Sequence, residues 1–224
     1  GCTGLYNINI PHNIIHIGDY AFSGCSNMTY LESIPENVTY IGSHAFDGCD
    51  FQEPVEMRST VPPTVGNTPF PAGTTLIVPR GCKEVYETTN GYEPYTIVEW
   101  EAEIGKNFEH QGIYYTVSDD VSTVSMTGSS TEWEFGNTIT IQDTITYMGQ
   151  SFAVTAIGEH AFSQLYGVDY VIMESETPPI LEGSYEIQGM TLIVPENCTQ
   201  NYVESEDGSW GDFRRIMEIG RAHV

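Results

Sequence analysis

Two histidines have the spacing of metal ligands on one helix face. His12 and His16 are four residues apart, and helical residues at that spacing lie side by side. Proline and glycine interrupt this segment, however, and favour a coil over a helix. His44 and His160 each follow an Ile-Gly-x sequence and share one position of a repeat. We therefore expect structural histidines, no metal ligand and no cofactor.

The cysteines could instead supply a reactive thiol, because their number is odd. They are Cys2, Cys25, Cys49, Cys82 and Cys198. Cys25 and Cys49 each follow Ala-Phe-x-Gly, and Leu165 occupies the same position in a later copy. A position that accepts leucine requires a small apolar side chain, and no Cys-x-x-Cys pair indicates zinc. The sequence predicts free, structural thiols.

Carboxylates dominate the charge, with 31 Asp and Glu against 7 Lys and Arg, a net charge of −24 over 224 residues. Such a chain repels nucleic acid and anionic lipid, and the scattered charge fits the solubility of a secreted protein. A calcium site is the alternative, but Ser118-Asp119-Asp120 is a weak match to a calcium loop. The sequence contains none of the common catalytic motifs, and we predict that it is not an enzyme.

The chain is organised by a repeat. Residues 34–49 reproduce residues 10–25, so that Ile-Pro, Ile-Gly, Ala-Phe and Gly-Cys each recur 24 positions later. A third copy, Ile157-Gly-Glu-His-Ala-Phe162, lies 116 positions after Ile41. A period in the twenties is typical of a solenoid, in which equivalent residues of successive coils form stacked columns.

We predict that these columns form the core, and that the glycine of each Ile-Gly pair adopts an unusual φ at a bend. The predicted core residues are Ile10, Ile17, Phe22, Cys25, Ile34, Ile41, Phe46, Cys49, Ile157, Phe162 and Leu165.

The pattern resembles the leucine-rich repeat of the BspA-like family, over residues 1–49 and 152–165. The first copy carries it on Leu5, Ile8, Ile10-Pro11, Ile14, Ile17-Gly18, Ala21-Phe22 and Gly24-Cys25. The resemblance implies a curved parallel sheet in a surface or secreted protein of anaerobic bacteria, with a role in adhesion or binding.

The pattern after the repeats also recurs. Residues 55–99 contain Thr75-Leu-Ile-Val-Pro79, Cys82 and Tyr86, and equivalents of all three return 116 positions later. We interpret residues 1–100 as a truncated repeat unit with a closing cap. Residues 101–219 form a second unit, with a β opening segment over 101–150, a repeat over 151–170 and a closing cap over 171–219. Residues 220–224 end a sequence that resembles a translated sequencing adapter, and we predict a non-native tail.

The predicted fold is therefore mostly β. It is a leucine-rich-repeat solenoid with short parallel strands, a β-hairpin opening segment, β-rich capping segments and little helix. Two short helices are expected, over residues 83–89 and 199–204. No run of about 18 apolar residues is present, so the sequence predicts no membrane insertion.

Solenoids bind partners through exposed sheet faces. Alternation with the inward residues predicts the outward residues Asn7, Asn9, Tyr30, Glu32, Glu56, Arg58 and Glu174 as ligand-binding candidates. We predict a monomeric, extracellular or cell-surface module that binds a protein or glycan of a host or neighbouring cell. A structural spacer that displays another domain is the alternative.

Overall fold

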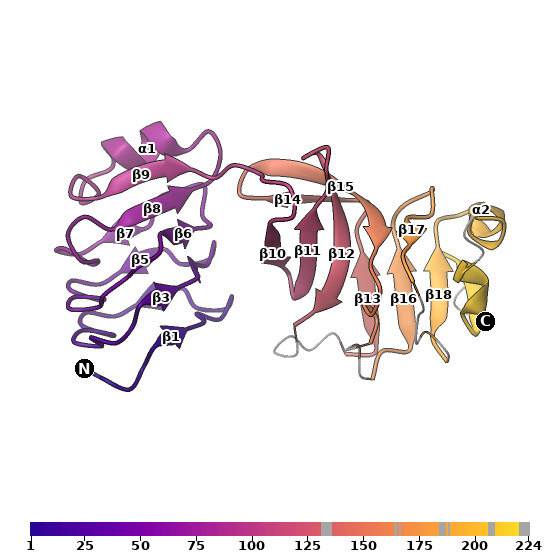
Figure 1. The fold of residues 1–224 in the computed structure, drawn as a ribbon, viewed down its shortest axis with the longest axis horizontal. Coiled ribbons are helices and arrows are strands. Elements are labelled where there is room, and N and C mark those ends of the chain that lie inside the picture. The colour runs from indigo at the N-terminus through magenta and orange to yellow at the C-terminus, as the bar shows by residue number, and fades with distance from the viewer. Residues whose placement is uncertain are drawn as a thin grey trace. The chain divides into compact units, whose positions relative to one another are not determined.

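A computed structural model describes residues 1–130, 136–163, 165, 167–183, 187, 189–205 and 209–219 (Figure 1). The predicted tail, 220–224, lies outside these residues. The chain divides into two compact units, each described here by itself. Unit 1 comprises Gly1–Glu101 and Met148–Gln150, and unit 2 comprises Ala102–Tyr147 and Ser151–Val224.

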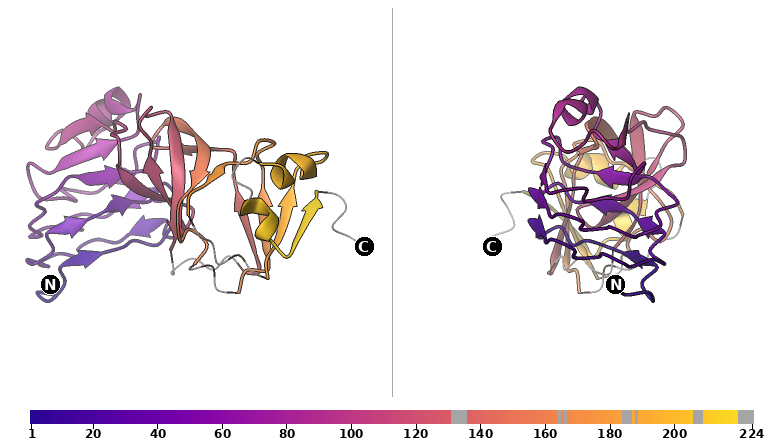
Figure 2. Two further views of the ribbon diagram at one scale, coloured as in Figure 1. Left: turned by 45° about the vertical axis from the view of Figure 1, so that its right-hand side comes forward. Right: turned by 90° about the vertical axis from the view of Figure 1, so that its left-hand side faces the viewer.

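Unit 1 is built from short strands and one helix. Their bounds are β1 Asn7–Ile8, β2 His16–Ile17, β3 Tyr30–Leu31, β4 Ser33–Ile34, β5 Tyr40–Ile41, β6 Val55–Met57, β7 Thr64–Val65, β8 Thr75–Val78, α1 Lys83–Thr88 and β9 Thr96–Glu99. The strands form three parallel sheets, β1-β3, β2-β5-β7 and β4-β6-β8-β9. Successive coils therefore stack on one another, as the further views in Figure 2 show.

An aromatic column runs through these coils. Phe22, Phe46 and Phe70 stack with centroid separations of 5.2 and 5.3 Å, close to the strand spacing of about 4.8 Å. Phe46 is fully buried, whereas Phe22 is only half-buried because it lies in the first complete coil. The other predicted core positions are buried in both units, and Cys25 lies beside Cys49.

Phe70 corrects the sequence interpretation, which ended the repeats of unit 1 before residue 53. Residues 65–70 form a third Ile-Gly-type segment, in which Pro69 replaces Ala45. Phe46 N–H donates to the Pro69 carbonyl at 2.8 Å, just as Phe22 N–H donates to the Ala45 carbonyl at 2.7 Å. Pro69 cannot donate the turn bond that Ala45 N–H makes to the Gly42 carbonyl at 3.3 Å, but it keeps the carbonyl that joins neighbouring coils.

The prediction of an unusual φ at the glycine of each Ile-Gly pair is wrong. The glycines of the Ile-Gly pairs have no positive φ; that conformation falls two residues later, at Tyr20, His44, Thr68 and His160. At Gly42, a Cβ atom would lie 2.3 Å from the Asp19 nitrogen of the neighbouring coil. Close approach between coils, rather than backbone conformation, therefore requires glycine there.

A cap follows the coils of unit 1. Tyr86 of α1 is buried and donates its hydroxyl to the Ser59 carbonyl at 2.8 Å. Tyr92 packs edge-on against Tyr86 and donates to the Pro63 carbonyl at 3.0 Å. These bonds satisfy carbonyl groups at the last coil that no further strand pairs with.

Unit 2 begins with a hairpin and continues as parallel strands. The bounds are β10 Asn107–His110, β11 Ile113–Val117, β12 Thr123–Ser129, β13 Thr138–Ile141, β14 Thr144–Tyr147, β15 Gln150–Ile157, β16 Tyr170–Met173, β17 Ile180–Leu181, β18 Thr191–Val194, α2 Thr199–Val203, the 3₁₀ helix η1 Ser209–Asp212 and β19 Arg215–Glu218. One sheet has the order β10-β11-β12-β15-β14, with β17 also paired to β15, and the other has the order β13-β16-β18-β19.

The cap of unit 2 repeats that of unit 1. Tyr202 donates to the Ser175 carbonyl at 2.7 Å, and Trp210 donates its indole N–H to the Pro179 carbonyl at 3.1 Å. Trp210 thus takes the place of Tyr92. Cys82 and Cys198 precede α1 and α2 with nearly identical backbone angles. The predicted fold class is confirmed: a mostly β solenoid with a hairpin opening and two short α-helices in the described part.

The aromatic column predicts the cost of core substitutions. Phe46→Ala and Phe162→Ala should each lower the free energy of unfolding by about 3–5 kcal/mol, because each ring is buried. Phe22→Ala should cost less, since its ring is already half-exposed. Chemical denaturation of the purified variants measures all three. Equal, small losses at Phe22 and Phe46 would contradict a stacked core.

The thiols offer a second prediction. All five are free, and Cys2 is exposed. Burial, with a smaller contribution from Cys25, raises the pKa of Cys49 to about 11. The reactive thiolate of Cys49 therefore forms only as the pH rises toward that value. Near about pH 8, close to an ordinary thiol pKa, iodoacetamide should modify Cys2 well before Cys49 in the folded protein. Mass spectrometry checks this, with the unfolded chain, in which the preference should vanish, as the control.

Candidate binding face

The predicted binding residues, Glu174 apart, lie in unit 1. Asn7 and Tyr30 are partners in the parallel β1–β3 pair, so their side chains stand side by side. Asn9 and Glu32 are exposed beyond the ends of these strands, and Glu56 is half-buried on β6. The buried Leu31, Val55 and Met57 alternate with them and point into the core. We call the outward residues Asn7, Asn9, Tyr30, Glu32, Glu53, Glu56, Ile77 and Val98 the Tyr30 face.

Tyr30 is the central aromatic group of this face, with 42% of its surface exposed. Its pKa is raised, first by partial burial and then by the negative charges of Glu32, Glu56 and Glu53, against a smaller opposing effect of Arg58. These carboxylates therefore lie close enough to the phenol to act on it. Like any phenol at neutral pH, the hydroxyl is protonated and can donate a hydrogen bond.

Glu53 was missed from the sequence. It lies 23 residues after Tyr30, which itself lies 23 residues after Asn7. Gln52 N–H donates to the Thr29 carbonyl at 2.9 Å, and this bond brings Glu53 beside Tyr30. Extending the Asn7–Tyr30 spacing by one more coil would have found it.

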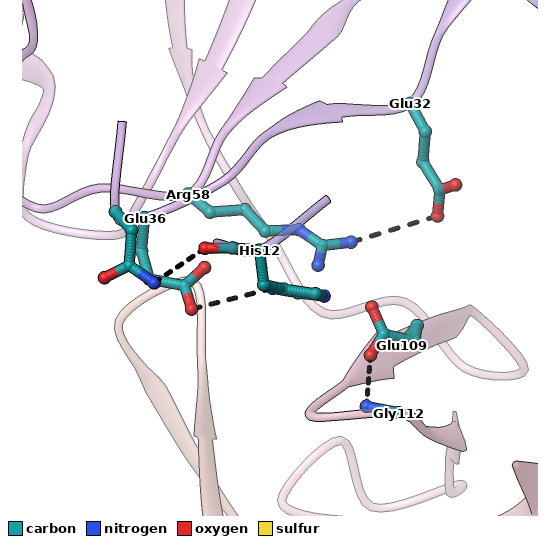
Figure 3. A network of polar contacts seen from close by, with 7 residues as sticks. His12, Glu32, Glu36, Arg58, Glu109 and Gly112 are labelled. Carbon is teal, nitrogen blue, oxygen red and sulfur yellow. Dashed lines mark hydrogen bonds and ion pairs between the residues drawn. The ribbon is translucent and has the colours of Figure 1, made fainter. Parts of the chain in front are cut away.

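Arg58 differs from the prediction that it is an outward contact. Its side chain is only 8% exposed, and its guanidinium lies 3.8 Å from the half-exposed carboxylate of Glu32 (Figure 3). A buried guanidinium beside an exposed carboxylate holds that carboxylate in place more than it offers a positive surface. Arg58 therefore supports the Tyr30 face rather than forming part of it.

The other end of the face is aliphatic. Glu56 pairs with Ile77 on β8, and Ile77 pairs with Val98 on β9. Ile77 is half-buried between Leu76 and Val78, which are buried on the inner side, and Val98 is exposed. The Tyr30 face thus combines a phenol, three carboxylates and two aliphatic side chains, which come from the β1-β3 pair, the β4-β6-β8-β9 sheet and the segments beside them.

Glu174 lies apart from these residues, in unit 2. It is exposed directly after β16, and its N–H donates to the Ile141 carbonyl at 3.1 Å. It occupies the position of Arg58, 116 residues later. The sequence therefore grouped Glu174 with residues of unit 1 because it shares their position in the repeat, although it lies in unit 2.

The histidines and acidic residues form structural contacts. His12 Nδ1 lies 3.8 Å from Glu36 (Figure 3). His44 stacks on Tyr20 with ring centroids 5.2 Å apart. Asp120 accepts hydrogen bonds from Ser122 and Thr123, which lower the pKa of its carboxyl. Across the part of the chain that the structure describes, no cluster of three or more His, Cys, Asp or Glu side chains could hold a metal ion.

Among the helices in the described ranges, none combines the length and the apolar character needed to cross a lipid bilayer.

Comparison with known proteins identifies the repeats. A family model described as BspA type leucine rich repeat region (6 copies) matches residues 1–70, which include the third coil and Phe70. Neither the curated proteins nor the solved structures contain a significant match. The matched segment carries the stacked coils and most of the Tyr30 face. Residues 1–70 therefore carry leucine-rich repeats of the BspA type.

Proposed function

We propose that the chain is a non-catalytic binding module of a bacterial surface or secreted protein, and that its partner docks on the Tyr30 face. The observation that carries this proposal is the exposed Tyr30 ring, held among three carboxylates on the sheet of a leucine-rich repeat. A tyrosine contributes large contact area and a hydrogen-bond donor at low entropic cost. The partner is a macromolecule of a host or neighbouring cell.

The chemistry of the face favours a protein partner that presents lysine or arginine. Glu32, Glu53 and Glu56 act together on Tyr30, and the only nearby cation in that set, Arg58, is mostly buried. An incoming cation would gain both the carboxylates and the face of the aromatic ring. Ile77 and Val98 would take the apolar part of the same segment.

A structural spacer is the second function that the repeats support. Stacked coils hold their two ends apart whether or not anything binds to them. The spacer requires nothing of the exposed Tyr30, whereas the binding module depends on it. The two functions therefore differ in what a substitution at Tyr30 should do.

Tyr30→Ala should weaken partner binding about tenfold or more, as expected when a central aromatic contact is removed. The measurement is binding of the purified chain to a panel of matrix proteins and surface glycans, with and without calcium. Tyr114→Ala is the matched control, because Tyr114 in unit 2 is also 42% exposed. Saturable binding that is unchanged in Tyr30→Ala would show that the partner does not dock on the Tyr30 face. An absence of binding to every member of the panel would favour the spacer.

A charge-based prediction tests the partner class. The double substitution Glu53→Gln and Glu56→Gln should slow association with a lysine- or arginine-bearing partner and flatten its dependence on salt. Glu84→Gln with Glu101→Gln removes the same charge from exposed positions elsewhere in unit 1. Association rates at several ionic strengths distinguish the pairs. Equal rates for both double variants would mean that net charge alone attracts the partner.

A further inference from the structure

Unit 2 contains a pocket of about 170 Å³ that the binding face does not use. It is formed by the hairpin of β10 and β11, which lie side by side in Figure 1, together with β13 and the residue after it. The lining residues are His110, Gln111, Ile113, Tyr115, Ile139, Thr140 and Gln142.

The hairpin turn shapes one side of this pocket. Gln111 and Gly112 form a two-residue turn with φ values of 51° and 79°, the left-handed pair that suits the twist of a hairpin. The Glu109 carboxylate accepts the Gly112 N–H, as Figure 3 shows, and so fixes the turn. His110 and Gln111 are thereby presented at the pocket on a constrained backbone.

Tyr115 provides the main evidence for a ligand. Its side chain is 1% exposed, its ring packs against Phe108 at 5.9 Å, and it lines the pocket. Within the described ranges its hydroxyl has no hydrogen-bond partner. Burial raises the pKa of this phenol, so it stays protonated and can donate. Because Tyr115 lines the pocket, its hydroxyl can donate to a polar ligand atom that enters there.

A buried hydroxyl, that of Ser129, lies on the same side of the sheet. Ser129 on β12 is directly opposite Ile113, and opposite residues in an antiparallel pair project to the same face. Its side-chain oxygen is buried and makes no hydrogen bond to any described residue. Ser129 is not among the residues that line the pocket, so the case for a polar occupant rests on Tyr115 and the other lining side chains.

The lining chemistry defines that occupant. In a chain with 31 carboxylates, the seven lining residues include no Asp, Glu, Lys or Arg. The polar groups are two side-chain amides, two hydroxyls and one imidazole, which both donate and accept hydrogen bonds. The volume equals that of about five or six liquid water molecules, and is below the roughly 300 Å³ of pockets for larger ligands.

We propose that this pocket binds one neutral sugar ring, with the Tyr115 hydroxyl donating a hydrogen bond to it. A sugar ring presents several hydroxyls in a compact volume and carries no charge that would need a lysine or carboxylate. The site lies entirely within unit 2, so a test of sugar binding there is independent of any test of the Tyr30 face.

The test is an NMR titration of the full chain with glucose, galactose, mannose and N-acetylglucosamine. Glucosamine and glucuronate serve as charged analogues, and glycerol as a small polyol. We expect at least one neutral sugar to shift the amide signals of residues 110–115 and 139–142 in a saturable way. The methyl glycoside of that sugar then separates a free monosaccharide from the end of a glycan, since only a glycan-end site should accept it equally.

Two variants complete the test. Tyr115→Phe, which removes only the hydroxyl, should weaken sugar binding about three- to tenfold, while Tyr114→Phe on the opposite, exposed face should leave it unchanged. Without sugar, Tyr115→Phe should melt no lower than the parent. No binding by any sugar, equal binding of glycerol or a charged analogue, unchanged affinity in Tyr115→Phe, or a lower melting temperature of that variant would each overturn the proposal.

Discussion

The structure of unit 1 depends on one interaction, the hydrogen bonding of each coil to the equivalent position of the next. Tyr20 and Phe22 donate to carbonyls of the second coil, and His44 and Phe46 donate to the same positions of the third. This regular spacing places like side chains in columns. It explains both the stacked phenylalanine rings and the exclusion of any side chain at Gly42.

The last coil of a stack needs a cap, and the two units have caps of the same design. Tyr86 and Tyr202 bind carbonyls 27 residues earlier, and each packs edge-on, at 5.2 Å, against a second aromatic ring. That ring is Tyr92 in one cap and Trp210 in the other. The conserved feature is a polar hydrogen on a large ring aimed at a proline carbonyl, so the residue type changes while the contact remains.

The sequence was sufficient for the columns because they repeat. Phe46 and Phe162 could be placed in the core from spacing alone, and both are buried. The sequence was misleading where the residue type did not match the role of its position. Pro69 stands where other coils have alanine, yet its carbonyl still joins the coils, and Arg58 alternates as an outward residue but lies against Glu32. The Tyr115 pocket has no sequence signal, because it depends on how a hairpin packs beside β13.

The same constraint leaves the outward residues free to diverge. Val55 and Met57 recur as Val171 and Met173, buried in both units, because the columns require them. The residues that alternate with them do not recur: Glu56 becomes Ile172, and the mostly buried Arg58 becomes the exposed Glu174. Since stability fixes only the inward set, each unit can present different chemistry on an equivalent sheet. The two units are therefore better understood as one scaffold with two distinct surfaces than as duplicate copies of one binding site.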